Sequence, residues 1–344
     1  MKILALGELE KGDLRFFKPL DGHDITWFNT IKTRPHAFAW KESRQLIAAL
    51  KGEEYDLILC GRHAHIKTMG LLRKGLSETV RKVKYPKSFG PSLIVQYARS
   101  TPCAVLDMGD LPLVDHHTFP LLQNGVRYFK RELPVNPLNA FLYTSPAFKS
   151  RQGIAEGAGP HLHKLRPISI GVDDAPWDED LTTLPKTADL FYAGNIQGHP
   201  IRERGVARLR ALADQGLRVD IPKERLDFET FQKRLAAAHL VWSPEGMGWE
   251  CYRHYEAALA GSVPVMNRPG IQRHQPLQEG VHGLFYDPSV FGELERVVLQ
   301  GLADKERLKK ISRTARNFVL QHHTHQALAR HILAETQAAH PIQS

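Results

Sequence analysis

Short apolar runs alternate with amphipathic stretches along most of the chain, and this alternation predicts strands that are followed by helices. In the first half, strand-like runs occupy residues 2–7, 23–29, 55–61, 102–110, 139–148 and 164–171. Apolar residues recur at helical spacing over 39–52 and 92–101, and the first of these stretches ends at Gly52, a typical helix stop. The first half therefore reads as a series of βα units.

The second half repeats this alternation. Strands are predicted at 188–195, 217–222, 239–244, 262–267 and 282–287, and helices at 200–216, 228–238, 249–261, 308–323 and 325–339. Strands that alternate with helices build parallel sheets covered by helices. Both halves are therefore predicted to be Rossmann-like, doubly wound parallel-sheet domains of the α/β class.

A change of composition separates the two halves. Residues 167–187 are rich in acids, contain Pro167, Pro176 and Pro185, and have little helical periodicity, as expected of a connector. The sequence predicts an N-terminal domain over 1–170, a C-terminal domain over 171–324, and a final helix in 325–344 that crosses back to the first domain. A ligand is expected in the cleft between the two domains.

The charge of the chain, its cysteines and its lack of long apolar runs indicate which partners and locations are expected. The 344 residues carry a formal net charge of +9, which favours anionic partners such as nucleotides or nucleic acid, unless the charge only serves solubility. The three cysteines form no CxxC pair, so no zinc site or disulfide framework is predicted, and a cytoplasmic setting is expected. No apolar run approaches the roughly 20 residues of a membrane span, and the first residues read as a strand instead of a signal peptide.

The segment between the predicted strand 239–244 and the following helix has the composition of a phosphate-binding loop. Gly246 and Gly248 allow a ligand to approach the backbone closely, and a helix N-terminus offers free N–H groups and partial positive charge. Arg253 and Glu256 are three residues apart, so both project from one helix face. They could bind phosphate and ribose hydroxyls; the alternative is an exposed Arg–Glu pair.

The continuation of this helix resembles a known family. Residues 253–265, RHYEAALAGSVPV, resemble the donor-binding helix of GT-B glycosyltransferases, in particular exostosin-type and family-1 (spore-maturation-like) members and phage DNA glucosyltransferases. The resemblance implies that Glu256 binds the donor ribose and Arg253 the diphosphate, beside Glu245 and Gly246 of the donor loop. It covers residues 188–325 and implies that no metal or other cofactor is needed.

A second stretch, residues 189–212, is similar to the strand–loop–helix of the same enzymes. The resemblance implies that Gly194, Asn195 and Arg202 meet the donor phosphates. The alternative is an ordinary loop with solvated arginines. Retaining members of the family usually have two glutamates with seven residues between them. If Glu256 is the second of these, the first would be at position 248, where this sequence has Gly248. Inversion of the anomeric centre is therefore expected.

The N-terminal half must supply the acceptor site and a general base. Asp107 and Asp110 follow a predicted strand, and phage DNA glucosyltransferases place a base aspartate at a similar strand end; ordinary turn chemistry is the alternative. His116, Lys130 and Arg131 are auxiliary candidates, although the charged run around Lys130 also reads as a solvated surface.

These features predict an enzyme that transfers a sugar from a nucleotide-diphosphate sugar, such as a UDP-sugar, to a hydroxyl on a glycan or lipid-linked saccharide. Peripheral contact with a membrane is compatible with such an acceptor. Two alternatives stay open: a glucosyltransferase acting on a hydroxymethylated base in DNA, for which the charge of +9 speaks, and a non-catalytic protein that binds nucleotides or nucleic acid.

Overall fold

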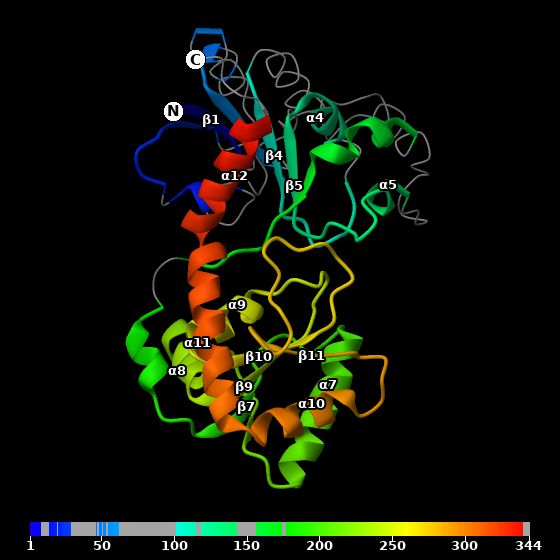
Figure 1. Ribbon diagram of the computed structural model, residues 1–344, viewed down its shortest axis with the longest axis vertical. Helices are drawn as coiled ribbons and strands as arrows, with labels where there is room; N and C mark the ends of the chain where they lie inside the picture. The colour runs from blue at the N-terminus through cyan, green and yellow to red at the C-terminus, as the bar shows by residue number, and fades with distance from the viewer. Residues whose placement is uncertain are drawn as a thin grey trace, which may run out of the picture. The chain divides into compact units, whose positions relative to one another are not determined.

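The computed structural model groups the chain into two compact units, which are described one at a time (Figure 1). Unit 1 contains Met1–Ile168 and Ala329–Ser344, and unit 2 contains Ser169–Leu328. The structure describes residues 1–7, 14–18, 20–28, 46, 48–49, 51–52, 54–61, 101–114, 118–142, 156–173 and 177–339. Of the helix predicted at 39–52, the described residues 46, 48, 49, 51 and 52 are helical, whereas the helix predicted at 92–101 lies outside the described residues except for its last position.

Unit 1 is built on a parallel sheet. Its strands are β1 (Lys2–Leu6), β2 (Asp24–Phe28), β3 (Leu57–Gly61), β4 (Cys103–Asp107), β5 (Arg127–Lys130) and β6 (Leu165–Pro167). Their order is β2-β1-β3-β4-β5-β6, and every neighbouring pair is parallel. The chain thus moves outward from β1 in both directions, which is the doubly wound arrangement.

The helical elements of unit 1 come from both ends of the chain. They are η1 (Arg15–Phe17), α4 (Phe119–Asn124), α5 (Asn139–Leu142), η2 (Gly159–Lys164) and the last part of α12 (His325–Ala339). Within this unit, Glu335 of α12 accepts a hydrogen bond from Arg166 Nε at 3.1 Å and lies 3.5 Å from Arg127 Nε. The end of α12 is therefore tied to the neighbouring strands β5 and β6.

Two sequence-based predictions for unit 1 are wrong. The segment 139–148 was expected to be a strand, but its described part forms the helix α5 over Asn139–Leu142. Asn136 starts this turn, since its side chain accepts the Leu138 N–H at 3.1 Å and its carbonyl accepts the Asn139 N–H. The charged run that begins at Arg127, expected at the surface, begins with the buried strand β5.

Unit 2 contains a second parallel sheet. Its strands are β7 (Ala188–Phe191), β8 (Val219–Asp220), β9 (Ala238–Ser243), β10 (Val263–Asn267) and β11 (Leu284–Tyr286). Their order is β11-β10-β9-β7-β8, again with parallel pairs throughout. From β7 the chain first moves to β8 on one side and then to β9 on the other, so the strand order reverses between β7 and β9.

Helices cover both faces of this sheet. They are α7 (Pro200–Asp214), α8 (Phe228–Ala236), α9 (Tyr252–Leu259), α10 (Glu293–Leu302) and α11 (Lys305–His322), and a short helix, η3 (Glu179–Thr183), precedes β7. Successive strand residues enter different cores: Leu190 and Tyr192 pack with α7 and α10, whereas Phe191 packs with α8, α9 and α11. Figure 1 shows these two groups of helices on opposite sides of the strands.

One close contact fixes α7 on the sheet. A Cβ atom on Gly205 would lie only 2.1 Å from the Trp242 ring of β9. Trp242 is fully buried, and its indole N–H donates to the Tyr286 hydroxyl of β11 at 3.0 Å. Glycine is therefore needed at position 205 because the helix lies directly on the indole ring.

The expected fold class, two parallel α/β sheets covered by helices, is confirmed. In the parts of the chain that the structure describes, we find no helix with the length and apolarity that crossing a membrane requires.

Candidate functional site

The reversal point of the second sheet brings together the two loops that the sequence singles out. Residues 192–199 follow β7 and residues 244–251 follow β9, and these two strands are parallel neighbours. Both loops therefore leave the sheet at its carboxyl edge. Ligands of open parallel sheets bind at this edge, beside the point where the strand order reverses.

Arg202 of α7 joins the two loops. Its Nε donates to the Glu245 carbonyl at 2.8 Å, and its Nη1 donates to the Asn195 carbonyl at 3.0 Å. The side chain is buried, with an exposed fraction of 8%. Arg202 therefore holds the loop after β7 against the loop after β9, and much of its hydrogen-bonding capacity is used within the protein.

The two predicted glycines of these loops each leave room for a guanidinium group. A Cβ atom on Gly246 would lie 2.7 Å from Arg202 Nη2, and one on Gly194 would lie 2.6 Å from Arg253 Nη2. Any larger residue would displace the arginine. The sequence assigned these glycines to close approach of a ligand; the structure adds a second reason for each, which is close approach of an arginine.

Arg253 is the most exceptional side chain in this region. It extends from α9 toward Gly194, and its guanidinium carbon lies 5.1 Å from the centre of the Tyr192 ring. Its exposed fraction is 8%, yet its Nη1 has no hydrogen-bond partner among the described residues. Buried charged donors rarely remain unpaired, because each lost bond to water costs free energy. This atom is therefore a strong candidate for binding an anionic ligand.

Glu256 lies one turn after Arg253 on α9 and is half-buried. Burial raises the pKa of Glu256 to about 7, and the positive charge of Arg253 only partly opposes this effect. Within the described structure the two side chains form no ion pair, so the alternative of an ordinary exposed Arg–Glu pair does not hold. The carboxylate remains available as an acceptor for hydroxyl groups.

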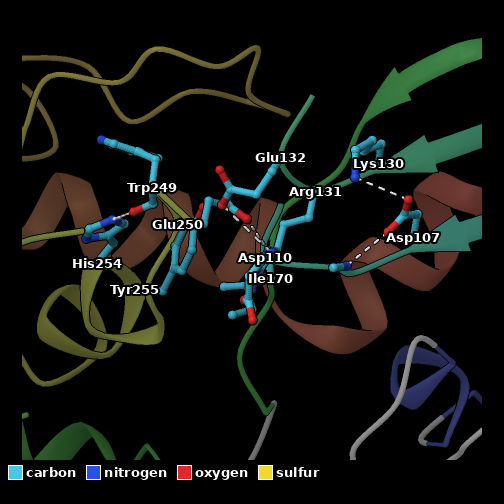
Figure 2. Close-up of polar contacts among 11 residues, drawn as sticks. Asp107, Asp110, Lys130, Arg131, Glu132, Ile170, Trp249, Glu250, His254 and Tyr255 are labelled. Atoms are coloured by element: carbon cyan, nitrogen blue, oxygen red, sulfur yellow. Dashed lines mark hydrogen bonds and ion pairs between the residues drawn. The ribbon is translucent and has the colours of Figure 1, made fainter. Parts of the chain in front are cut away.

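A buried histidine shapes the segment that leads into α9. His254 Nε2 donates to the Trp249 carbonyl at 3.0 Å, so its Nδ1 accepts the Ser243 hydroxyl at 2.7 Å. Burial lowers the pKa of His254 to about 3, which keeps the ring neutral. The helix was expected to start near Trp249 but begins at Tyr252, because residues 249–251 form these loop contacts instead. Figure 2 shows Trp249 and His254 together.

Glu245 is anchored by the end of the neighbouring strand. Asn267, the last residue of β10, accepts the Glu245 N–H at 2.8 Å and donates its own amide to Glu245 Oε2 at 2.7 Å. Glu250, further along the same loop, accepts the Ile170 N–H at 2.7 Å and the Tyr255 hydroxyl (Figure 2). These bonds fix the loop before any ligand binds.

In unit 1, the two candidate bases have different surroundings. Asp107 ends β4 and is fully buried. Its Oδ2 lies 3.1 Å from Lys130 Nζ (Figure 2). The same oxygen accepts the Tyr128 hydroxyl at 2.9 Å, while Oδ1 accepts the Gly109 N–H at 3.0 Å. Lys130 faces Asp107 across neighbouring strands and is fully buried as well. The expectation that Lys130 lies on a solvated surface is therefore wrong.

Asp110 is exposed and pairs with Arg131, which follows β5 and is itself buried. The carboxylate of Asp107 fixes the intervening turn through Gly109. His116 lies outside the described residues. Among the residues that the structure describes, no group of three His, Cys, Asp or Glu side chains is arranged to hold a metal ion.

Comparison with solved structures identifies the architecture. A sucrose-phosphate synthase from Thermosynechococcus elongatus aligns over 98% of this chain and 99% of its own, with 12% identity and a TM-score of 0.57. HepE from Anabaena, in complex with UDP, aligns over 98% and 100%, with 15% identity and a TM-score of 0.53. These are GT-B proteins. The chain has the GT-B fold.

A third GT-B structure is an alpha-glucosyltransferase in complex with UDP-glucose and DNA containing an abasic site. It aligns over 98% of this chain and 99% of its own, with 10% identity and a TM-score of 0.55. At the sequence level, residues 219–275 match the family described as the RXYLT1 C-terminal domain. This range contains β8, α8, β9, α9 and β10. No curated protein sequence matches the chain.

Several residues that shape the site are not among those predicted from the sequence. Tyr192 lies under Arg253, Ser243 orients His254, and Asn267 anchors Glu245. Each stands at or just after the carboxyl end of a strand of the GT-B fold. In the sequence, each is a polar or aromatic residue at the end of an apolar run. This position predicts that the residue lies near the carboxyl edge of the sheet, but it does not predict which side chain it contacts.

Proposed function

We propose that the protein is a glycosyltransferase that binds a nucleotide-diphosphate sugar at the carboxyl edge of the sheet in unit 2. The observation that carries this proposal is the buried Nη1 of Arg253, beside the N-terminus of α9, which has no hydrogen-bond partner among the residues that the structure describes. A diphosphate oxygen would satisfy this donor and would also meet the positive end of the helix. Related folds that bind UDP or UDP-glucose support this choice of ligand.

Glu256 completes the nucleotide site in this proposal. Its carboxylate would accept hydrogen bonds from the two ribose hydroxyls, while Arg253 three residues earlier contacts the diphosphate. In the transfer step, the acceptor oxygen forms a bond to the anomeric carbon as the bond from that carbon to the diphosphate breaks. Arg253 and the amides of α9 would stabilise the negative charge on the departing diphosphate.

A thermal-shift screen tests the donor assignment. A ligand that binds only the folded protein raises the unfolding midpoint. We expect one of UDP, GDP, dTDP and CMP, with UDP the first candidate, to raise the midpoint of the wild type and to have much less effect on Arg253→Gln. If none of the four changes the midpoint, the proposal is wrong. A non-catalytic nucleotide-binding protein would show the shift but release no sugar from the matching nucleotide sugar.

We assign the role of general base to Asp110 and not to Asp107. A base must reach the acceptor hydroxyl, and Asp110 is exposed, whereas Asp107 is fully buried and bonded to Lys130 and Tyr128. Asp110 would take the hydroxyl proton while Arg131 keeps the carboxylate oriented. Asp107 holds the turn that carries Asp110 and is a positioning residue.

Substitutions separate these two roles. Asp110→Asn should lower kcat by a factor of roughly 10² or more, as expected for loss of general-base catalysis, with little change in thermal stability. Asp107→Asn should lower stability as well as activity. The exposed Asp21→Asn in the same unit is the matched control. Full activity of Asp110→Asn would remove it from the mechanism.

A glycan or a lipid-linked saccharide is the acceptor that we propose. A hydroxymethylated base in DNA is the second candidate, favoured by the net charge of +9 and by the fold shared with an alpha-glucosyltransferase bound to DNA. Salt separates the two, because neutralising DNA phosphates releases counterions and makes binding fall steeply with ionic strength. Transfer to oligosaccharides that is insensitive to salt supports the glycan, whereas DNA binding that weakens steeply between 50 and 200 mM salt supports the base.

The stereochemistry and conditions of the reaction are further parts of the proposal. We expect inversion, because Gly248 stands where retaining relatives keep a glutamate, and NMR of the first product formed would show which anomer arises. No metal is expected, so activity should persist in EDTA. A cytoplasmic location is expected from the cysteine content, and the three cysteines are free thiols.

A further inference from the structure

A pocket lies at the edge of the sheet in unit 2 opposite to the candidate nucleotide site. It is a cavity of about 530 Å³ at the amino-terminal ends of β7, β9 and β10, next to α11 and η3. This volume is within the range of sites for small molecules. The residues that line it are Glu179, Thr182, Thr183, Leu184, Lys186, His239, Gly261, Leu308, Lys309, Ser312, Arg313, Arg316 and Asn317.

The wall of this cavity is strongly positive. Lys186, Lys309, Arg313 and Arg316 contribute four cations, and Glu179 is the one acidic residue of the lining. Lys309 is compensated by an ion pair with Glu306 at 2.7 Å, so the net charge comes from Lys186, Arg313 and Arg316. Burial lowers the pKa of Lys186 to about 8, and burial together with Lys305 and Lys186 lowers the pKa of His239. Such a concentration of like charge is unfavourable when the cavity holds only solvent, and a bound anion would relieve it.

Only part of this charge has a structural role. Lys186 Nζ donates to the carbonyls of Ala236 and Gly261 at 2.7 and 2.8 Å, and Arg316 donates to the Leu259 carbonyl. These two cations therefore hold the chain where α8 and α9 end.

Arg313 and His239 are different. Among the described residues, neither side chain makes a hydrogen bond or an ion pair, and the same is true of Asn317. Arg313 and Asn317 lie four residues apart on α11, so their side chains project from the same face of that helix, beside the cavity. The cavity thus combines fixed positive charge with the exposed N–H donors of Arg313 and Asn317, which have no hydrogen-bond partner among the described residues.

This cavity is separate from the candidate nucleotide site. The six residues of β9 run from one edge of the sheet to the other, which is a distance of roughly 20 Å at the usual rise per residue. A nucleotide at Arg253 and a molecule at Arg313 would therefore not touch each other.

We propose that this cavity is a binding site for a small multivalent anion that carries phosphate or carboxylate groups. Lys186 and Arg316 supply the fixed charge, and Arg313 and Asn317 supply the donors that contact the ligand. The proposal does not depend on the glycosyltransferase assignment, since it rests on a different set of residues at a different edge of the sheet.

Calorimetric titration of the full-length protein with two probes, inorganic pyrophosphate and citrate, tests the proposal. The Arg253→Gln variant is used as the parent, so that anion binding at the nucleotide site does not contribute. We expect saturable binding of at least one probe, and the better probe tells phosphate from carboxylate chemistry. Adding Arg313→Gln should weaken this binding by about tenfold or more, because a charge-assisted hydrogen bond is lost.

Lys310→Gln, added to the same parent, is the matched control. Lys310 is exposed on the same helix but does not line the cavity, so the variant removes one positive charge without removing a ligand contact. It should change affinity by no more than about twofold, as expected for an exposed charge. Equal weakening by the Arg313 and Lys310 substitutions, or no binding of either probe, would overturn the proposal. Unchanged circular dichroism and midpoints would show that all variants are folded.

Discussion

Replacing Arg253 by glutamine separates a ligand-binding arginine from a structural one. The guanidinium lies over Tyr192 and beside Gly194, and its Nη1 donates to nothing in the described part of the protein. In the free protein this buried charge has lost its bonds to water without full replacement. Its removal should therefore cost the free protein little stability and can even increase it.

The nucleotide complex should respond in the opposite way. A charge-assisted hydrogen bond to phosphate contributes about 1.5–3 kcal/mol, so Arg253→Gln should weaken UDP binding by a factor of roughly 10 to 150. The variant also removes the positive charge that opposes the raised pKa of Glu256, so that pKa should rise further above about 7. Lower affinity without lower stability is the pattern that distinguishes a binding residue from one that supports the fold.

Two measurements check this pattern. Isothermal titration calorimetry gives the dissociation constant for UDP, and differential scanning calorimetry gives the unfolding midpoint without ligand. Arg210→Gln is the matched control, because Arg210 is exposed on α7 and should change neither quantity. The interpretation of Arg253 is refuted if the variant binds UDP as tightly as the wild type, or if its midpoint without ligand falls by many degrees.

Three further variants test other parts of the structure. The raised pKa of Glu256, about 7 instead of 4.5, means that the folded protein keeps a proton which the unfolded chain has lost, so wild-type stability should fall by about 2 kcal/mol from pH 5 to pH 8 through this group. Urea unfolding of Glu256→Gln should lack this component; equal pH dependence in both proteins would contradict it. Gly205→Ala should destabilise by about 1–3 kcal/mol or more, seen as a lower urea midpoint, because its methyl group would collide with Trp242; an unchanged midpoint would argue against that contact. Lys130→Met should cost about 3–5 kcal/mol because Asp107 loses its cationic partner, whereas the double variant with Asp107→Asn should recover part of this loss.

The fold of unit 2 could be predicted well from the sequence. Its strands are short apolar runs, and its helices have apolar residues at helical spacing together with recognisable starts. For example, Asp227 caps α8 by accepting the Thr230 N–H at 2.8 Å, and Pro200 begins α7. Local sequence is sufficient here because each element carries its own signal.

Strand β5 shows why other parts could not be predicted. Its sequence, RYFK, contains a cation at each end, and nothing in it indicates that Lys130 is fully buried. Burial becomes possible because Asp107 occupies the opposite position on β4, in a strand pairing that joins residues 23 positions apart. A buried ion pair is a property of the pairing, so neither strand reveals it alone.

The helix α5 illustrates a different limit. Residues 139–142 are NAFL, and such a short apolar segment fits a strand and a helix equally well. The deciding signal lies before it, where Asn136 and Pro137 form a turn that starts the helix. The apolar run alone therefore does not distinguish a strand from a helix, and the turn before it does.

The two buried arginines of the site show that a sequence motif does not distinguish a ligand-binding arginine from a structural one. In the sequence, Arg202 and Arg253 are equivalent: each lies at the start of a helix that follows a glycine-containing loop, and each was assigned to phosphate. In the structure, Arg202 donates to two loop carbonyls, whereas Nη1 of Arg253 meets no acceptor in the described part of the chain. The difference arises from the β7–β9 pairing, which brings the carbonyls of Asn195 and Glu245 within reach of the Arg202 guanidinium but brings no described acceptor to Nη1 of Arg253. Arg202 therefore has a structural role, since it holds the two loops together, and Arg253 is the arginine that has a hydrogen-bond donor available for a ligand.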